Sequence, residues 1–285
     1  MDQRIISLYD EYTHKPLTRE VFLKRLAAIT GSMALALSVT PLLESNYAKA
    51  ATIREDDEDL ETETISYEVN GITMFAYTAK PKKKMNMGAV MVIHENRGLT
   101  EHIKDVTRRA AKAGYFAMAP DALSESGGTP AVEDEARKLF TQLDAKKNLA
   151  NFIKSVDFLR ARKETNRKVG CVGFCWGGGL ANQLAVNVPT LNAAVAFYGA
   201  QPKAEDVPKI KCAVQLHYAG LDERIDAGIP AYEEALKKAG VIYELYMYPG
   251  VNHAFHNDTS EARYNADAAL HAWKRTLDFF EVNLK

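Results

Sequence analysis

Apolar residues recur along the chain with two spacings, which together predict alternating strands and helices from residue 62 onward. Residues 64–69 and 72–77 alternate apolar and polar side chains around Asn70-Gly71, and this pattern predicts a β-hairpin. Apolar runs predict buried strands at residues 88–93 and 169–174, and further strands are predicted at 115–119, 193–198, 212–218 and 242–248. Helices are predicted at residues 101–113, 131–160, 229–238 and 261–280. This alternation predicts an α/β fold with a mainly parallel sheet and helices on both faces.

The stretch 168–179 predicts a sharp turn between a strand and a helix. The apolar run ends at residue 174, three glycines follow at 177–179, and residues 180–186 suit a helix packed on that strand. Between them, Gly173-Phe-Cys-Trp-Gly177 has the form of a nucleophile elbow, with cysteine where serine usually stands. The first amides of the helix favour a negative charge on the sulfur. We therefore hypothesise that Cys175 is a nucleophile, whereas Cys171 inside the strand is predicted to fill the core.

Candidate partners for Cys175 follow two later strands. Functional groups in parallel sheets collect where the strands end. Asp222 comes shortly after the strand at 212–218, and His253 lies in the loop that follows 242–248. Cys175, Asp222 and His253 thus occur in the order nucleophile, acid, base, which this kind of fold uses. We predict a catalytic triad in which His253 assists formation of the thiolate and Asp222 orients the imidazole.

Each partner has alternatives in the sequence. His256 lies three residues past His253, so a helical turn in that loop would let either ring face the thiol. Glu223 and Asp226 are nearby alternatives to Asp222. His94 and His217 lie in or beside predicted strands and are expected to be core residues with satisfied hydrogen bonds.

Composition narrows the class of protein. With 285 residues, 47% of them hydrophobic and 26% charged, the chain is expected to be globular. A net charge of −1 gives no electrostatic reason to expect nucleic-acid binding. Three cysteines without paired spacing argue against a disulfide scaffold, and the absence of CxxC and HExxH motifs predicts no metal and no cofactor. Cys171 and Cys175 would lie about 13 Å apart along a strand, too far for a redox disulfide.

Residues 1–61 differ from the predicted catalytic domain at 62–285. Residues 18–24 lead into an uncharged apolar run at 26–39, and Ala48-Lys-Ala50 has the form of a cleavage site, which together resemble a twin-arginine export signal. Glu20 stands where the second arginine would be. The alternative is a retained helical hairpin that docks on the domain or on a partner subunit, which would allow a homodimer through residues 1–60. The chain is accordingly expected to be either exported or cytoplasmic, with an acidic linker at 54–61 and no membrane span in the mature domain.

Residues 62–285 resemble the dienelactone hydrolase family, the carboxymethylenebutenolidases. The motifs that carry the resemblance are His94-Glu95-x-x-Gly98-Leu99, Gly173-Phe-Cys-Trp-Gly-Gly178, Gly220-Leu-Asp222 and His253-Ala-Phe255. The resemblance implies an α/β-hydrolase fold and hydrolysis of a small ester or lactone through a thioester on cysteine. It also implies that Glu95 contacts the resting thiol and that the backbone amides of Asn96 and Trp176 form the oxyanion hole.

The chain departs from the family where substrate is held. The dienelactone-specific enzymes carry one arginine soon after the Pro-Asp of the fourth strand and another four residues past the histidine. Here Pro120-Asp121 is followed by Ala-Leu-Ser-Glu-Ser, and the second position is Asn257. Arg97 or Arg263 could substitute, and Arg97 and Phe255 are predicted to line the substrate pocket. Ester chemistry is therefore expected, but dienelactone as the substrate is not implied.

A protein that binds without hydrolysing is the rival hypothesis. Such a scaffold protein would use the same fold, with the N-terminal hairpin as its docking element. Rapid reaction of a thiol with iodoacetamide near neutral pH would favour the hydrolase, because a binding protein has no need of an activated thiol.

Overall fold

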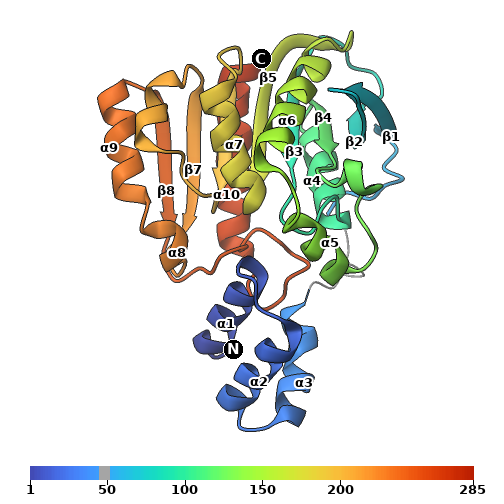
Figure 1. Ribbon diagram of the computed structural model, residues 1–285. Helices are drawn as coiled ribbons and strands as arrows, with labels where there is room; N and C mark the ends of the chain where they lie inside the picture. The colour runs from blue at the N-terminus through green and yellow to red at the C-terminus, as the bar shows by residue number, and fades with distance from the viewer. Residues whose placement is uncertain (45–51) are drawn as a thin grey trace.

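The chain folds into an α/β domain with a small group of helices at its N-terminal end (Figure 1). The computed structural model describes residues 1–44 and 52–285. The predicted cleavage site at residues 48–50 lies outside the described residues. The α/β domain is a single sheet sandwiched between two layers of helices, which confirms the predicted fold class.

Eight strands form one twisted sheet in the order β1-β2-β4-β3-β5-β6-β7-β8. The predicted hairpin is confirmed as an antiparallel pair, and β2 is also antiparallel to β4, whereas all later pairs are parallel. The strands are β1 (Leu60–Val69), β2 (Ile72–Pro81), β3 (Met87–Ile93), β4 (Phe116–Pro120), β5 (Thr165–Phe174), β6 (Ala193–Phe197), β7 (Ala213–Ala219) and β8 (Tyr243–Tyr248).

Helices cover both faces of the sheet and bury a separate hydrophobic core on each. One face packs on α6 (Ala145–Arg160), α7 (Trp176–Asn187) and α9 (Ile229–Ala239). The other packs on α4 (Glu101–Lys112) and α10 (Ala266–Leu284). The predicted helix at 131–160 is instead two helices, α5 (Glu133–Phe140) and α6, because Asp144 caps the amides of Lys146 and Lys147 and starts a new helix. Shorter helical turns are η1 (Ser124–Ser126), η2 (Ala204–Lys209) and α8 (Glu223–Asp226).

The N-terminal segment contains three helices where a hairpin was one expectation. They are α1 (Gln3–His14), α2 (Arg19–Thr30) and α3 (Met33–Leu43). The apolar run at 26–39 is broken because Gly31 adopts a left-handed conformation (φ 89°) and Ser32 caps α3. Among the described helices none is by itself long and apolar enough to cross a membrane. The pair α2 and α3 would pass that test by length and composition alone, and it is bent by 110°.

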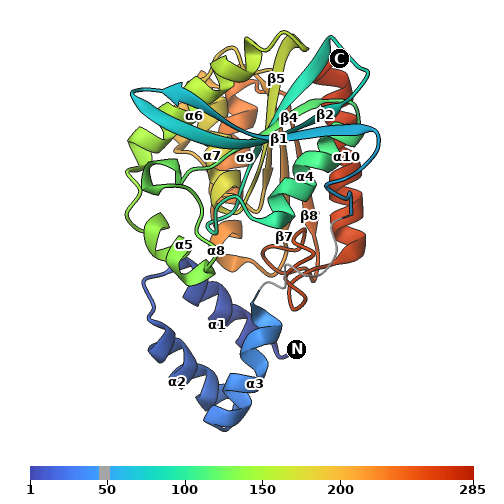
Figure 2. The same cartoon turned by 90° about the vertical axis from the view of Figure 1, so that its right-hand side faces the viewer.

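The three helices share a small core of their own and lie beyond the carboxyl ends of the parallel strands (Figure 2). Part of the predicted linker contacts the α/β domain, because Lys112 of α4 pairs with Asp57 and Asp59. Strand β1 begins at Leu60, which is buried, so the last two residues of the predicted linker at 54–61 belong to this strand.

Two neighbouring glycines of α7 give a prediction about stability. A Cβ on Gly178 would lie 2.5 Å from the carbonyl oxygen of Phe197, which cannot move without disturbing β6. A Cβ on Gly179 would make ordinary contacts at 3.5 Å. We expect Gly178→Ala to lower the free energy of unfolding by about 1–3 kcal/mol or more, whereas Gly179→Ala stabilises the helix by up to about 1 kcal/mol. Denaturant unfolding of both variants checks this, and equal stability of the two would contradict the close packing of α7 on β6.

Candidate active site

Cys175 occupies a strained turn between β5 and α7. Its backbone has φ 56° and ψ −114°, a conformation that few residues other than glycine adopt, and its N–H donates to the carbonyl of Phe197 at 3.0 Å. A Cβ on Gly173 would lie 1.9 Å from the carbonyl oxygen of Gly177, so the turn closes because glycine stands there. The predicted elbow geometry is thus present, and it sets the thiol above the carboxyl end of the sheet with a residue exposure of 6%.

Asp222 and His253 meet beside this turn. Asp222 follows β7 and caps the short helix α8, and His253 lies in the loop after β8. The Nδ1–H of His253 donates to Oδ2 of Asp222 at 2.5 Å, and both side chains are buried. That bond directs Nε2 of His253 away from the carboxylate, and among the described residues Nε2 has no hydrogen-bond partner. The nearest ligand atoms of His253 and Cys175 lie within 4.8 Å of each other.

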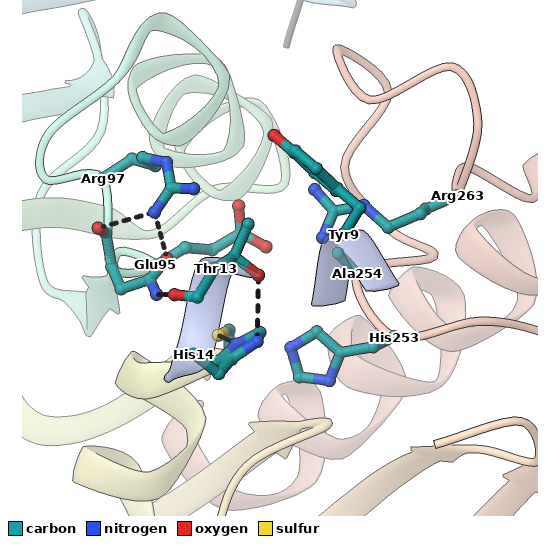
Figure 3. A pocket seen from close by; sticks show the side chains of 10 residues that line it. Tyr9, Thr13, His14, Glu95, Arg97, His253, Ala254 and Arg263 are labelled. Atoms are coloured by element: carbon teal, nitrogen blue, oxygen red, sulfur yellow. Dashed lines mark hydrogen bonds between the residues drawn. The ribbon is translucent and has the colours of Figure 1, made fainter. Parts of the chain in front are cut away.

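A second histidine, which no motif in the sequence indicated, contacts the thiol. Nε2 of His14, at the end of α1, lies 3.1 Å from Sγ of Cys175 (Figure 3). The Nδ1–H of His14 donates to the carbonyl oxygen of Asp10 at 2.8 Å, and the Asp10 carboxylate lies 3.2 Å away. The one feature of the sequence that could have indicated this pair is the spacing of Asp10 and His14, one helical turn apart. Nothing in the sequence indicated that this helix reaches Cys175.

Charges around the sulfur favour the thiolate. Burial alone would raise the pKa of Cys175, but the positive charges of His14 and His253 outweigh it and lower the pKa to about 6. Burial opposes the charged form of both imidazoles as well, yet Asp10, Asp222 and the thiolate raise the pKa of His253 well above its usual value. The pKa of His14 is also raised, by the thiolate and Asp10, against the effect of burial. A thiolate flanked by imidazolium is therefore the favoured state near neutral pH.

Glu95 does not make the predicted contact with the thiol. Its two carboxylate oxygens accept from Nδ2 of Asn257 at 2.6 Å and from the hydroxyl of Tyr198 at 3.4 Å. Glu95 still lines the cavity beside Cys175. The physical reason for the difference is that Asn257 holds the carboxylate while His14 occupies the place next to the sulfur.

The residues predicted to supply oxyanion-hole amides flank the same turn. Trp176 is the first residue of α7, so its amide has no carbonyl one turn earlier to bond. Asn96 lies in the turn after β3, and its side-chain amide donates to the carbonyl of Thr13 at 2.8 Å. Asn96 and Cys175 line the same cavity. Asn96 therefore also connects the α/β domain to the N-terminal helix.

The predicted substrate-pocket residues separate into two groups. Arg97 and Arg263 both line the small cavity beside Cys175, and Arg263 packs its guanidinium over the ring of Tyr9 at 5.1 Å (Figure 3). Phe255 differs from its prediction, because it is completely buried among Tyr198, Tyr248 and other aromatic rings and does not line this cavity. The arginines are thus the members of the predicted set that lie near the thiol.

A larger groove of about 1260 Å³ opens from Cys175 between the N-terminal segment and the helices α5, α7 and α8. Residues 13–19 form one wall. Apolar side chains supply much of the lining, among them Leu17, Phe140, Leu143, Trp176, Leu180 and Ile225. His14 and His253 both reach this groove, so a bound molecule in it would lie next to the sulfur and both imidazoles.

The alternative histidines lie elsewhere. His256 is buried with its ring stacked on Phe174, and burial holds the pKa of His256 well below its usual value. His94 is satisfied by the carbonyl of Glu95 and the amide of Ala122, as predicted. His217 is likewise satisfied, by Tyr248 and Gln215, at 3.0 and 2.9 Å.

The alternative acids and thiols are also apart from the site. Asp226 does not bond His253, and burial together with the charge of Asp222 raises the pKa of Asp226 to about 6. Glu223 is exposed on α8. Cys171 is completely buried in the core, as predicted, and burial raises the pKa of this thiol well above its usual value. No disulfide joins the described cysteines.

His14, Cys175 and His253 also form a set of donors that could accept a metal. One ligand atom from each lies within 4.8 Å of the others, and thiolate and imidazole are ligands of zinc. Ligands of a tetrahedral zinc, at about 2.0–2.3 Å from the ion, lie roughly 3.5 Å apart. The same side chains also fit acid–base chemistry, because His14 contacts the sulfur and His253 bonds Asp222.

Comparisons with known proteins agree with one another. The model of the "Dienelactone hydrolase family" matches residues 74–284. A candidate carboxymethylenebutenolidase of Saccharolobus solfataricus is 34% identical over 253 residues, which cover 75% of this chain and 96% of that protein. A second, from Methylorubrum extorquens, is 30% identical and covers 93% of this chain and 95% of its own. The crystal structure of a candidate dienelactone hydrolase from Klebsiella pneumoniae superposes with a TM-score of 0.71 at 28% identity, covering 78% of this chain and 98% of that one.

Proposed function

We propose that this chain, which belongs to the dienelactone hydrolase family, hydrolyses esters or lactones through a thioester on Cys175, with His253 as the base and Asp222 as its orienting acid. The observation that carries the proposal is the arrangement of these three groups. The thiol stands on a strained turn, and a 2.5 Å bond to Asp222 fixes His253 with Nε2 directed away from the carboxylate. The nearest ligand atoms of His253 and Cys175 lie within 4.8 Å of each other.

The reaction follows from this arrangement. The thiol gives its proton to an imidazole, and the thiolate attacks the carbonyl carbon, so that a C–S bond forms and the carbonyl electrons move to oxygen. The amides of Asn96 and Trp176 stabilise that charge, an effect on the order of 3 kcal/mol for each donor. The C–O bond then breaks, and the departing oxygen takes a proton from His253. Water, deprotonated by His253, cleaves the thioester and restores the thiolate.

The groove indicates the class of ester. Its apolar lining favours a substrate whose acyl or alcohol part is a hydrocarbon chain, and the arginines of the smaller cavity favour a polar group near the carbonyl. Thiolates are good leaving groups, so esters with stable leaving groups and enol lactones should react faster than amides. The proposal therefore covers activated and apolar esters as well as lactones.

A series of nitrophenyl esters tests the groove. We expect kcat/KM to rise from acetate to hexanoate by about three- to fourfold for each methylene, because each buried methylene contributes about 0.8 kcal/mol. The measurement is initial rates at low substrate, with the spontaneous hydrolysis of each ester as its reference. Rates that fall with chain length would contradict the assignment of the groove to substrate, and no hydrolysis of any ester or lactone would contradict the proposed function.

A further inference from the structure

We propose that His14, oriented by Asp10 on helix α1, is a second active-site histidine that stabilises the Cys175 thiolate, so that the N-terminal helices belong to the catalytic machinery. This inference rests on the proposed role of Cys175 as nucleophile. It goes further, because it adds a catalytic residue and assigns a function to a segment that lies outside the family match at residues 74–284.

Two imidazoles flank the sulfur in the same way. Each carries its proton on Nδ1 because an aspartate residue accepts there, Asp222 for His253 and the Asp10 carbonyl for His14. Each therefore turns Nε2 toward the site of the thiol. Nε2 of His14 lies 3.1 Å from Sγ, and the rings of His14 and His253 meet edge to face with their centres 4.7 Å apart (Figure 3).

The position of α1 is fixed by contacts on both sides of His14. Arg137 of α5 donates to the carbonyl and the hydroxyl of Tyr12 at 2.7 and 2.8 Å, and its guanidinium lies 3.9 Å above that ring. Asn96 donates to the carbonyl of Thr13 at 2.8 Å. Arg224 of α8 approaches the Asp10 carboxylate at 3.6 Å. Contacts from three elements of the α/β domain thus hold the end of the helix, and His14 is built into the site.

The chemistry gives the two imidazoles different tasks. When the thiol loses its proton to His14, the imidazolium stays next to the sulfur, balanced by Asp10. His253, whose pKa is raised well above its usual value, is then itself protonated, and it gives that proton to the departing oxygen as the C–O bond breaks. In the second half of the reaction water adds to the thioester, His253 takes its proton, and the C–S bond breaks. Sulfur then leaves as a thiolate, and the imidazolium of His14 stabilises that charge by a hydrogen bond.

Other charged groups face the same space and must be separated from the effect of His14. They come from several elements: Asp10 of α1, Glu95 and Arg97 after β3, Asp222 and Asp226 at α8, Arg224 of α8, and His253 and Arg263 of the loop after β8. Asp226 titrates in the same range as the thiol, since its pKa is raised to about 6. An Asp226→Asn background removes that group from the measurement.

The test is the pH dependence of alkylation of Cys175 by iodoacetamide in the full chain. Cys171 and Cys212 are buried with raised pKa values, so peptide mapping should find the label on Cys175. In the native chain the rate should rise with pH through a midpoint near 6, where the thiolate forms. In His14→Gln the midpoint should move upward by about one pH unit or more, because an imidazolium that stabilises the thiolate is gone.

A variant with space beside the sulfur makes the test specific. In His14→Ala the midpoint should also rise, and added imidazole should bring it back toward the native value, a rescue that a merely structural residue would not show. His271→Gln, an exposed histidine on α10, is the matched control and should behave as the native chain. A native midpoint in both His14 variants, while Cys175→Ala still abolishes hydrolysis, would overturn the role of His14. Hydrolysis that survives Cys175→Ala would instead overturn the proposed function.

Discussion

Replacing Cys175 by alanine should abolish hydrolysis of an activated phenyl ester, with kcat/KM falling by at least about 10³-fold. In the proposed mechanism the thiolate forms the covalent bond to the acyl group, and without it the amides and imidazoles can act only on water. The measurement is the steady-state rate under conditions where the native chain turns over many times. Because alanine removes only the sulfur atom from this side chain, the variant should remain folded, which thermal unfolding can check.

Cys171 provides the matched control for this result. It lies four residues earlier in β5 and is completely buried, so Cys171→Ala removes a thiol of the same strand without touching the turn. We expect this variant to lose some stability, on the order of 1 kcal/mol, and to keep most of its activity. Equal loss of activity in the two variants at equal folded fraction would indicate a structural effect and contradict the role of Cys175.

Replacing Asp222 by asparagine should lower kcat by roughly 10²- to 10⁴-fold with little change of the fold. The carboxylate accepts from Nδ1–H of His253, and an amide in its place would either donate to that nitrogen or bond it more weakly. The imidazole would then adopt the wrong tautomer or lose the charge that stabilises its protonated form. The measurement is the kcat of Asp222→Asn across pH, compared with that of the native protein.

Asp226 is the control for Asp222, since it lies four residues further on, at the end of α8, with one carboxylate oxygen buried and unbonded among the described residues. Asp226→Asn removes a charge near Asp222 without touching His253. We expect its kcat to stay within about threefold of native. A large loss of kcat in Asp226→Asn, with native kcat in Asp222→Asn, would show that Asp226 and not Asp222 orients His253.

The sheet and the encounter of three distant loops could be predicted from the sequence. Every predicted strand is present. The central strands β3 and β5 were predictable because buried parallel strands need apolar runs bounded by turns, and the hairpin was predictable from its alternation around Asn70-Gly71. Cys175, Asp222 and His253 were predictable as neighbours for the same reason, since each follows a strand that ends at one edge of the sheet. Helix boundaries were less predictable, as at Asp144, where one capping side chain decides whether a helix continues.

The environment of the thiol could not be predicted from the sequence. The contact of His14 with Cys175 joins residues 161 positions apart and depends on how a separate helical unit docks. The position of Glu95 depends on its hydrogen bond with Asn257. In the sequence this asparagine was notable only because it stands where the dienelactone-specific enzymes carry an arginine. Local patterns determine which elements form, whereas such contacts follow from the packing of whole elements against one another.

The thioester itself is the most direct test of the account. A slowly hydrolysed ester is mixed with the native chain, quenched in acid within one turnover, and the peptides are mapped by mass spectrometry. We expect one acyl group on the peptide that contains Cys175, none on those with Cys171 or Cys212, and loss of the label on longer incubation. Turnover without any acyl group on Cys175, or with the acyl group on another residue, would contradict the account.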